Sequence, residues 1–186
     1  MRSEHEAFDR ALAARSDQLE CRPEESADAA FLHALAARCS PLHSLLPAPM
    51  LEQQAAAQEA SHRAQHPDAM RRIAAVAGVR AGRIVIDWGP VGVSHGVDIA
   101  VLPELRSSGV GLHLLRAWLD VADAGRWRCT LDVSRANPAI RLYAHLGFRV
   151  VGDQSGPEEH PFVRMARPPK RQASGSLWES HGCRNS

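Results

Sequence analysis

Apolar residues recur at helical spacing in several parts of the chain, and capping residues mark where these segments begin and end. Ser26 is the expected N-cap of the first segment, and Asn137 that of the last. Gly125 and Gly147 each follow the last apolar position of a segment, as C-terminal caps do. The spacing predicts helices over 26–39, 50–66, 109–124 and 137–147.

Alternating and continuous apolar runs, bounded by glycine and proline, predict the strands. The expected strand regions are 18–23, 72–89, 92–103, 128–134, 148–152 and 161–166. The second region holds two strands joined by a turn near Gly78 to Gly82, and the last two regions are expected to pair as a hairpin. This order of elements predicts an α/β (α+β) fold, with helices on both faces of a mixed sheet.

The two ends of the chain lack the regular apolar pattern of its middle. Residues 1–17 are polar except for Phe8 and Leu12, and they are expected to form a flexible or helical lead. Residues 168–186 show no apolar period and are expected to be a disordered tail. One folded domain is therefore predicted over 18–167, a length that suffices for one full core.

Composition narrows the possible function classes. The net charge of +1 argues against a nucleic-acid-binding protein, which usually carries a basic surplus. No apolar run approaches the length of a membrane span, and the first residues lack the hydrophobic segment of a signal peptide. The 4 cysteines are scattered without a CxxC pair and are interpreted as free thiols, which favours a cytoplasmic location.

Residues 101–111, V-L-P-E-L-R-S-S-G-V-G, place two glycines between a strand and a helix. A P-loop is excluded because no lysine lies nearby, and a dinucleotide-binding turn is disfavoured because Leu114 stands where its third glycine belongs. The N–H groups of Ser107 to Leu112 are expected to point into one small volume. A pyrophosphate fits there, and Arg106 can add a charged hydrogen bond. The alternative is a plain helix start with a flexible glycine lead.

A second motif, N-P-A-I-R-L-Y-A-H-L-G-F, follows at 137–148 after one predicted helix and one predicted strand. Together the two motifs resemble those of the GNAT superfamily of N-acetyltransferases, and the resemblance extends over about 19–167. The chain departs from the family at Ser107, because the family usually has a glycine directly after the arginine.

The resemblance implies acetyl-CoA as co-substrate, no metal, and a mostly antiparallel sheet with a V-shaped splay between two central strands. The gap is expected between the strand that ends at Val101 and the strand at 129–133. The pantetheine arm would bond the backbone of the first strand at Ile99 and Val101, and the N–H of Val101 would polarise the thioester carbonyl. The residues expected to hold the pyrophosphate are Arg106, Ser107, Ser108, Gly109, Val110, Gly111 and Leu112.

The same resemblance assigns roles to polar side chains around the gap. Tyr143, the only tyrosine, is the expected general acid toward the CoA thiolate, with a half-buried packing role as the alternative. Asn137 reaches the pantetheine or only caps its helix. Asp98 is the expected base, acting through a water, or it fixes the ammonium of the acceptor. Asp87 and His95 are weaker candidates, and a polar residue on a solvated strand face is the alternative for all three.

His62 and His66 form an H-x-x-x-H pair on the second predicted helix. Zinc proteases need a glutamate after the first histidine, and Arg63 stands there instead. The pair is therefore interpreted as part of a solvated helix face.

Two functions remain open at this point. The first is an acetyl-CoA-dependent N-acetyltransferase acting on a small amine or on an amino group of a peptide or protein. The second is a non-catalytic acyl-CoA-binding sensor or scaffold with the same fold, which the uncertain base and Ser107 keep open. No nucleic-acid or membrane partner is expected, and a homodimer is possible because homodimers are common in the superfamily.

Overall fold

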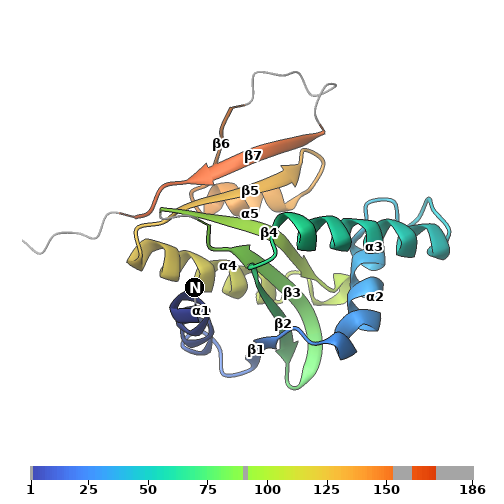
Figure 1. Cartoon of the computed structure of the whole chain (residues 1–186), viewed down its shortest axis with the longest axis horizontal. Coiled ribbons are helices and arrows are strands. Elements are labelled where there is room, and N and C mark those ends of the chain that lie inside the picture. The colour runs from blue at the N-terminus through green and yellow to red at the C-terminus, as the bar shows by residue number, and fades with distance from the viewer. Residues whose placement is uncertain (1, 90–91, 153–160, 171–186) are drawn as a thin grey trace, which may run out of the picture.

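A seven-stranded sheet forms the centre of the computed structural model, which describes residues 2–89, 92–152 and 161–170 (Figure 1). The strands are ordered β1-β2-β3-β4-β5-β7-β6, and neighbours are antiparallel except for the parallel pair β4 and β5. Their bounds are β1 (Leu19–Pro23), β2 (Met70–Val76), β3 (Val79–Asp87), β4 (Val93–Val101), β5 (Arg128–Ser134), β6 (Arg149–Val150) and β7 (Phe162–Arg167).

Helices cover both faces of the sheet, as the sequence predicts (Figure 1). The larger apolar core lies between the sheet and α1, α4 and α5, and it centres on Trp118 and Phe148, both fully buried. On the other face α2 and α3 pack through Leu32, Leu35 and Leu51. The helix bounds are α1 (Arg2–Ala13), α2 (Ala29–Cys39), α3 (Ala48–Gln65), α4 (Val110–Ala124) and α5 (Ala139–His145), with short 3-10 turns at Ser26–Asp28 and Pro103–Leu105.

Two local predictions need correction. Ser26 does not cap α2, because it begins a 3-10 turn and α2 starts three residues later, at Ala29. Gly82 does not belong to the turn between β2 and β3, because β3 begins at Val79 and runs through it. The turn itself is made by two residues with positive φ, Ala77 at 49° and Gly78 at 78°.

The first segment of the chain is a helix that packs on the core. Phe8 and Leu12 of α1 are 0 % and 1 % exposed, and α1 lies against α4. Asp9 accepts two hydrogen bonds from Arg72 of β2, each 2.9 Å long. The α1 helix is therefore fastened to the sheet by apolar and charged contacts. At the other end, residues 171–186 of the expected tail lie outside the described residues.

The predicted splay between the central strands is confirmed. β4 and β5 are paired only from Val93 opposite Arg128 to Gly96 opposite Leu131. Beyond that point β4 continues to Val101 without a partner on this side. A bulge at the same level, between Val85 and Ile86 in the pairing with β3, bends β4 away, since an extra residue on one strand increases its local twist.

Among the described residues, none of the helices is both long and apolar enough to cross a membrane.

Candidate functional site

The segment between β4 and α4 is a tight turn that contains two residues with left-handed backbone conformation. Pro103–Leu105 makes a 3-10 turn, Ser107 has a φ of 66°, and Gly109 has a φ of 91° just before α4 begins. The Ser108 hydroxyl donates a hydrogen bond of 2.6 Å to the carbonyl of Leu105 and fixes the loop. A serine in this conformation is strained, because left-handed backbone costs an L-residue about 1–2 kcal/mol.

This turn leaves a group of backbone donors unused at the start of α4. Within the part of the chain that the structure describes, the N–H groups of Ser107 and of 109–112 find no carbonyl acceptor. They lie at the positive end of a helix of 15 residues, and the exposed guanidinium of Arg106 lies directly before them. The arrangement is suited to bind an anionic group.

The free edge of β4 directs backbone groups into the gap. Leu102 donates its N–H to the carbonyl of Ala81 at 2.9 Å, on the side of β3. Because hydrogen bonds alternate along an antiparallel pair, the N–H and C=O groups of Ile99 and Val101 point the opposite way. The thiol of Cys39, at the end of α2, contacts the Val101 carbonyl at 3.4 Å, which agrees with this direction.

Tyr143 and Asn137 come from the segment after β5. Tyr143 of α5 is 8 % exposed and packs edge-on against Phe148, with ring centroids 6.1 Å apart. Burial, together with the negative charge of Asp98, raises the pKa of Tyr143 to about 12. Asn137 is exposed, and its side-chain oxygen accepts the N–H of Ala139 at 2.9 Å, but it is not the expected N-cap, because α5 begins at Ala139 with Pro138 as its N-cap.

Asp98 lies on β4 with its side chain on the α3 side, opposite to that of Val101, whose methyl faces α4. Its Oδ2 is 3.4 Å from Nε of Arg83 on β3, and its side chain remains 30 % exposed. Removal from water raises the pKa of the Asp98 carboxyl, and the positive charge of Arg83 opposes that shift. The negative charge of Asp98 contributes to the raised pKa of Tyr143.

A cluster that sequence reasoning missed surrounds Arg83. This arginine is 6 % exposed, and carboxylates of Glu24, Glu59 and Asp98 face it from three different segments. The one signal in the sequence is a charged residue directly before the apolar run Ile84 to Ile86. That signal identifies neither the burial of the arginine nor its partners.

The interpretation of His62 and His66 as a solvated helix face is wrong. Nδ1 of His66 lies 2.6 Å from Oδ2 of Asp87, and its ring stacks on that of His95 with centroids 5.6 Å apart. His62 is half-buried on the same side of α3. Because residues four apart lie on the same side of a helix, His62 and His66 both face the sheet. At this position the sheet presents polar side chains, so the helix face that covers it is polar as well.

Asp87 and His95 lie before the point at which β4 and β5 separate. His95 belongs to the part of β4 that pairs with β5, and its Nδ1 contacts the Thr130 hydroxyl at 3.0 Å. Burial lowers the pKa of His95, and the nearby Asp132 opposes the shift. Neither residue lies on the unpaired stretch of β4 that Asp98 occupies.

Comparisons with known proteins agree with this geometry. Residues 71–150 match the sequence model of a family described as an acetyltransferase (GNAT) domain. Comparison with curated protein sequences gives no match.

Solved structures of the same shape are numerous, and three examples cover most of the chain. PaiA N-acetyltransferase from Thermoplasma acidophilum, in complex with coenzyme A, is 18 % identical over 81 % of this chain and 98 % of its own, with a TM-score of 0.62. Ribosomal-protein-S18-alanine N-acetyltransferase from Escherichia coli is 20 % identical over 86 % and 99 %, with a TM-score of 0.58. Ard1 from Thermoplasma volcanium is 20 % identical over 83 % and 99 %, with a TM-score of 0.60. At these identities the similarity shows the fold.

Proposed function

This chain carries a GNAT acetyltransferase domain, and from that premise we propose that it transfers an acetyl group from acetyl-CoA to an amine. The observation that carries the proposal is the free edge of β4 that leads directly into the donor-rich turn before α4. An extended ligand with an amide-containing arm and a diphosphate would find acceptors and donors for both parts along this path. Acetyl-CoA is such a ligand.

Residues of the turn and of β4 would hold the coenzyme. The N–H groups of Ser107 and of 109–112 would bind the diphosphate, with Arg106 adding a charge-assisted hydrogen bond. The backbone of Ile99 and Val101 would pair with the pantetheine arm, and the contact between Cys39 and Val101 would yield to it. Gly109 and Gly111 add no side chain to this path.

The proposed reaction is direct attack of the amine nitrogen on the thioester carbonyl carbon. The new C–N bond forms, the C–S bond breaks, and the Val101 N–H stabilises negative charge on the carbonyl oxygen. The thiolate takes a proton from Tyr143, whose pKa of about 12 keeps the phenol protonated at neutral pH. The attacking nitrogen gives its proton to Asp98 through a water, and the raised pKa of this carboxyl suits it to a proton-accepting role.

An amine panel incubated with acetyl-CoA and a thiol reagent tests the proposal. Thiol release that depends on an amine is the expected result, with a small amine or a peptide amino group as acceptor. Coenzyme binding without release for any amine would instead favour the acyl-CoA sensor, for which the strained Ser107 in the binding turn is the supporting observation.

Tyr143→Phe tests the proposed acid. Phenylalanine keeps the edge-on packing against Phe148 but loses the proton donor, so kcat should fall by about 10²-fold or more while the Kd for CoA stays unchanged. Steady-state kinetics and calorimetric titration with CoA measure the two quantities. Unchanged turnover would remove Tyr143 from the mechanism.

A further inference from the structure

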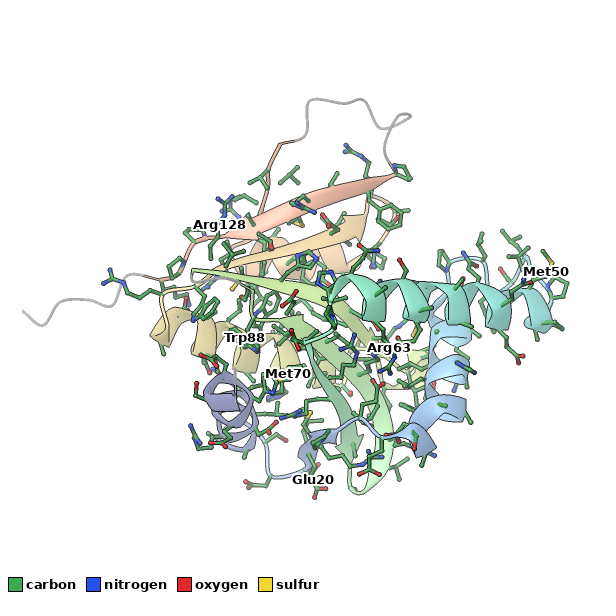
Figure 2. The ribbon with its side chains drawn as sticks, viewed as in Figure 1. Glu20, Met50, Arg63, Met70, Trp88 and Arg128 are labelled. Carbon is green, nitrogen blue, oxygen red and sulfur yellow. The ribbon has the colours of Figure 1, made fainter. Side chains whose placement is uncertain are left out.

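The buried guanidinium of Arg83 lies next to Asp98 and contacts the carboxylates of several residues. Nη1 of Arg83 binds Oε2 of Glu59 on α3 at 2.7 Å, while its Nε faces Asp98 at 3.4 Å and Glu24 at 3.7 Å. Arg63, where α3 meets the strands, forms ion pairs with both Glu24 and Glu59 (Figure 2). The two glutamates therefore have a second cation.

Among the described residues, Arg83 is the one arginine that forms an ion pair with Asp98. Within the described part of the chain, Nε and Nη2 of Arg83 are buried without a hydrogen-bond partner, so the closest contact of the guanidinium is the one between Nη1 and Glu59. Glu59 and Asp98 therefore compete for the charge of one guanidinium.

We propose that Arg83, which Asp98 shares with Glu59 and Glu24, is a positioning residue that holds the Asp98 carboxylate at the gap and sets the pH at which it takes up a proton. The positioning role in catalysis rests on the proposed acetyl transfer. The electrostatic control of Asp98 stands on the contacts alone and is measurable without turnover.

Charged and titratable groups on the surrounding elements interact electrostatically with Asp98. They are Arg83 of β3, Glu59 and His62 of α3, Glu24 after β1, Cys39 of α2 and Tyr143 of α5. The cations among them favour the ionised carboxylate and the two glutamates disfavour it. Removing Glu59 withdraws a negative charge and frees Arg83 for Asp98, so both effects lower the pKa of Asp98. Removing the charge of Arg83 raises it.

The test is a ¹³C NMR titration of the Asp98 carboxyl in the full chain, with the signal assigned by its loss in Asp98→Asn. Glu59→Gln should move the titration midpoint down and Arg83→Gln should move it up, each by about one pH unit. Arg83→Lys, which keeps the charge, should restore most of the wild-type midpoint. Asp120→Asn removes a carboxylate that pairs with Arg15 on the α4 face and serves as the matched control, with no shift expected.

Shifts of opposite sign in the two variants support the proposal, and an unchanged midpoint in Glu59→Gln overturns it even if Arg83→Gln fails to fold. The acidic limb of kcat/KM should move with the NMR midpoint. A midpoint that moves while the activity profile stays fixed overturns the positioning role in catalysis. A wild-type protein that transfers no acetyl group counts against the proposed function, and the NMR midpoint still decides whether Arg83 controls Asp98.

Discussion

The fold itself does not require a glycine at position 111. A methyl group added there would meet Cγ2 of Val101 at 3.7 Å, an ordinary contact, and the backbone φ is not positive. The fold therefore tolerates a side chain at this position. Under the proposed function, the coenzyme approaches the backbone closely here, and a side chain would obstruct it.

Gly111→Ala should weaken CoA binding by at least about tenfold, or 1.4 kcal/mol, without loss of stability. Alanine also favours helix over glycine by about 1 kcal/mol, which acts in the stabilising direction. Calorimetric titration with CoA and urea unfolding measure the two effects. Gly78→Ala is the control: its φ of 78° makes alanine strained by about 1–2 kcal/mol, but it lies in the β2–β3 turn, so binding should be unaffected. Undiminished affinity in Gly111→Ala would contradict the proposed position of the diphosphate.

The sequence reveals the identity of Ser107 but not its backbone conformation. Its identity marks a departure from the usual glycine, and that much is visible in the sequence. Its φ of 66° is a property of the folded turn, since the Ser108–Leu105 contact and the start of α4 fix the chain on both sides. Strain of this kind persists where the surrounding structure over-determines it.

The pairing of β3 with β4 depends on a close backbone approach at Gly82. A Cβ atom there would lie 2.4 Å from the carbonyl oxygen of Ala100, and this atom belongs to backbone that cannot swing away. Gly82 is directly opposite Val101, so any displacement would move the strand that lines the gap. Local sequence suggests a turn at this glycine, whereas the contact with β4 shows why the strand needs it.

Gly82→Ala should lower the free energy of unfolding by about 1–3 kcal/mol through this overlap. Urea unfolding followed by circular dichroism measures the loss. Gly111→Ala, whose added methyl meets no such overlap, is the matched control for stability. A Gly82→Ala protein as stable as wild type would mean that β3 and β4 are not held at this distance.

At the scale of the whole molecule, α1 is part of the core. Phe8 is fully buried in the apolar core, while Phe162 at the start of β7 is 61 % exposed. Phe8→Ala should therefore cost about 3–5 kcal/mol of stability. Phe162→Ala makes the same chemical change at the surface and should stay within about 0.5 kcal/mol of wild type.

The two phenylalanine variants are compared by their urea midpoints at equal protein concentration. Equal stability of Phe8→Ala and wild type would mean that α1 does not contribute to the core. A large loss in Phe8→Ala alone would show that the first helix folds with the rest of the chain.

The sequence by itself determined the elements and the two motifs. The apolar stripe of α4, the glycine turn before it and the segment around Tyr143 all follow from spacing and turn chemistry within short windows. These windows predicted the mixed sheet with helices on both faces, and through the family resemblance they predicted the splay between β4 and β5.

Only the tertiary structure decided the contacts between segments that are distant in the sequence. The partners of Arg83 come from segments that lie far from it in the chain, and the sheet-facing side of His66 depends on how α3 crosses β3 and β4. The burial of α1 likewise depends on α4, which lies at the far side of four intervening strands in the chain. Periodicity and capping report on neighbours within a few residues, whereas these contacts arise when distant segments pack together, so no local pattern contains them.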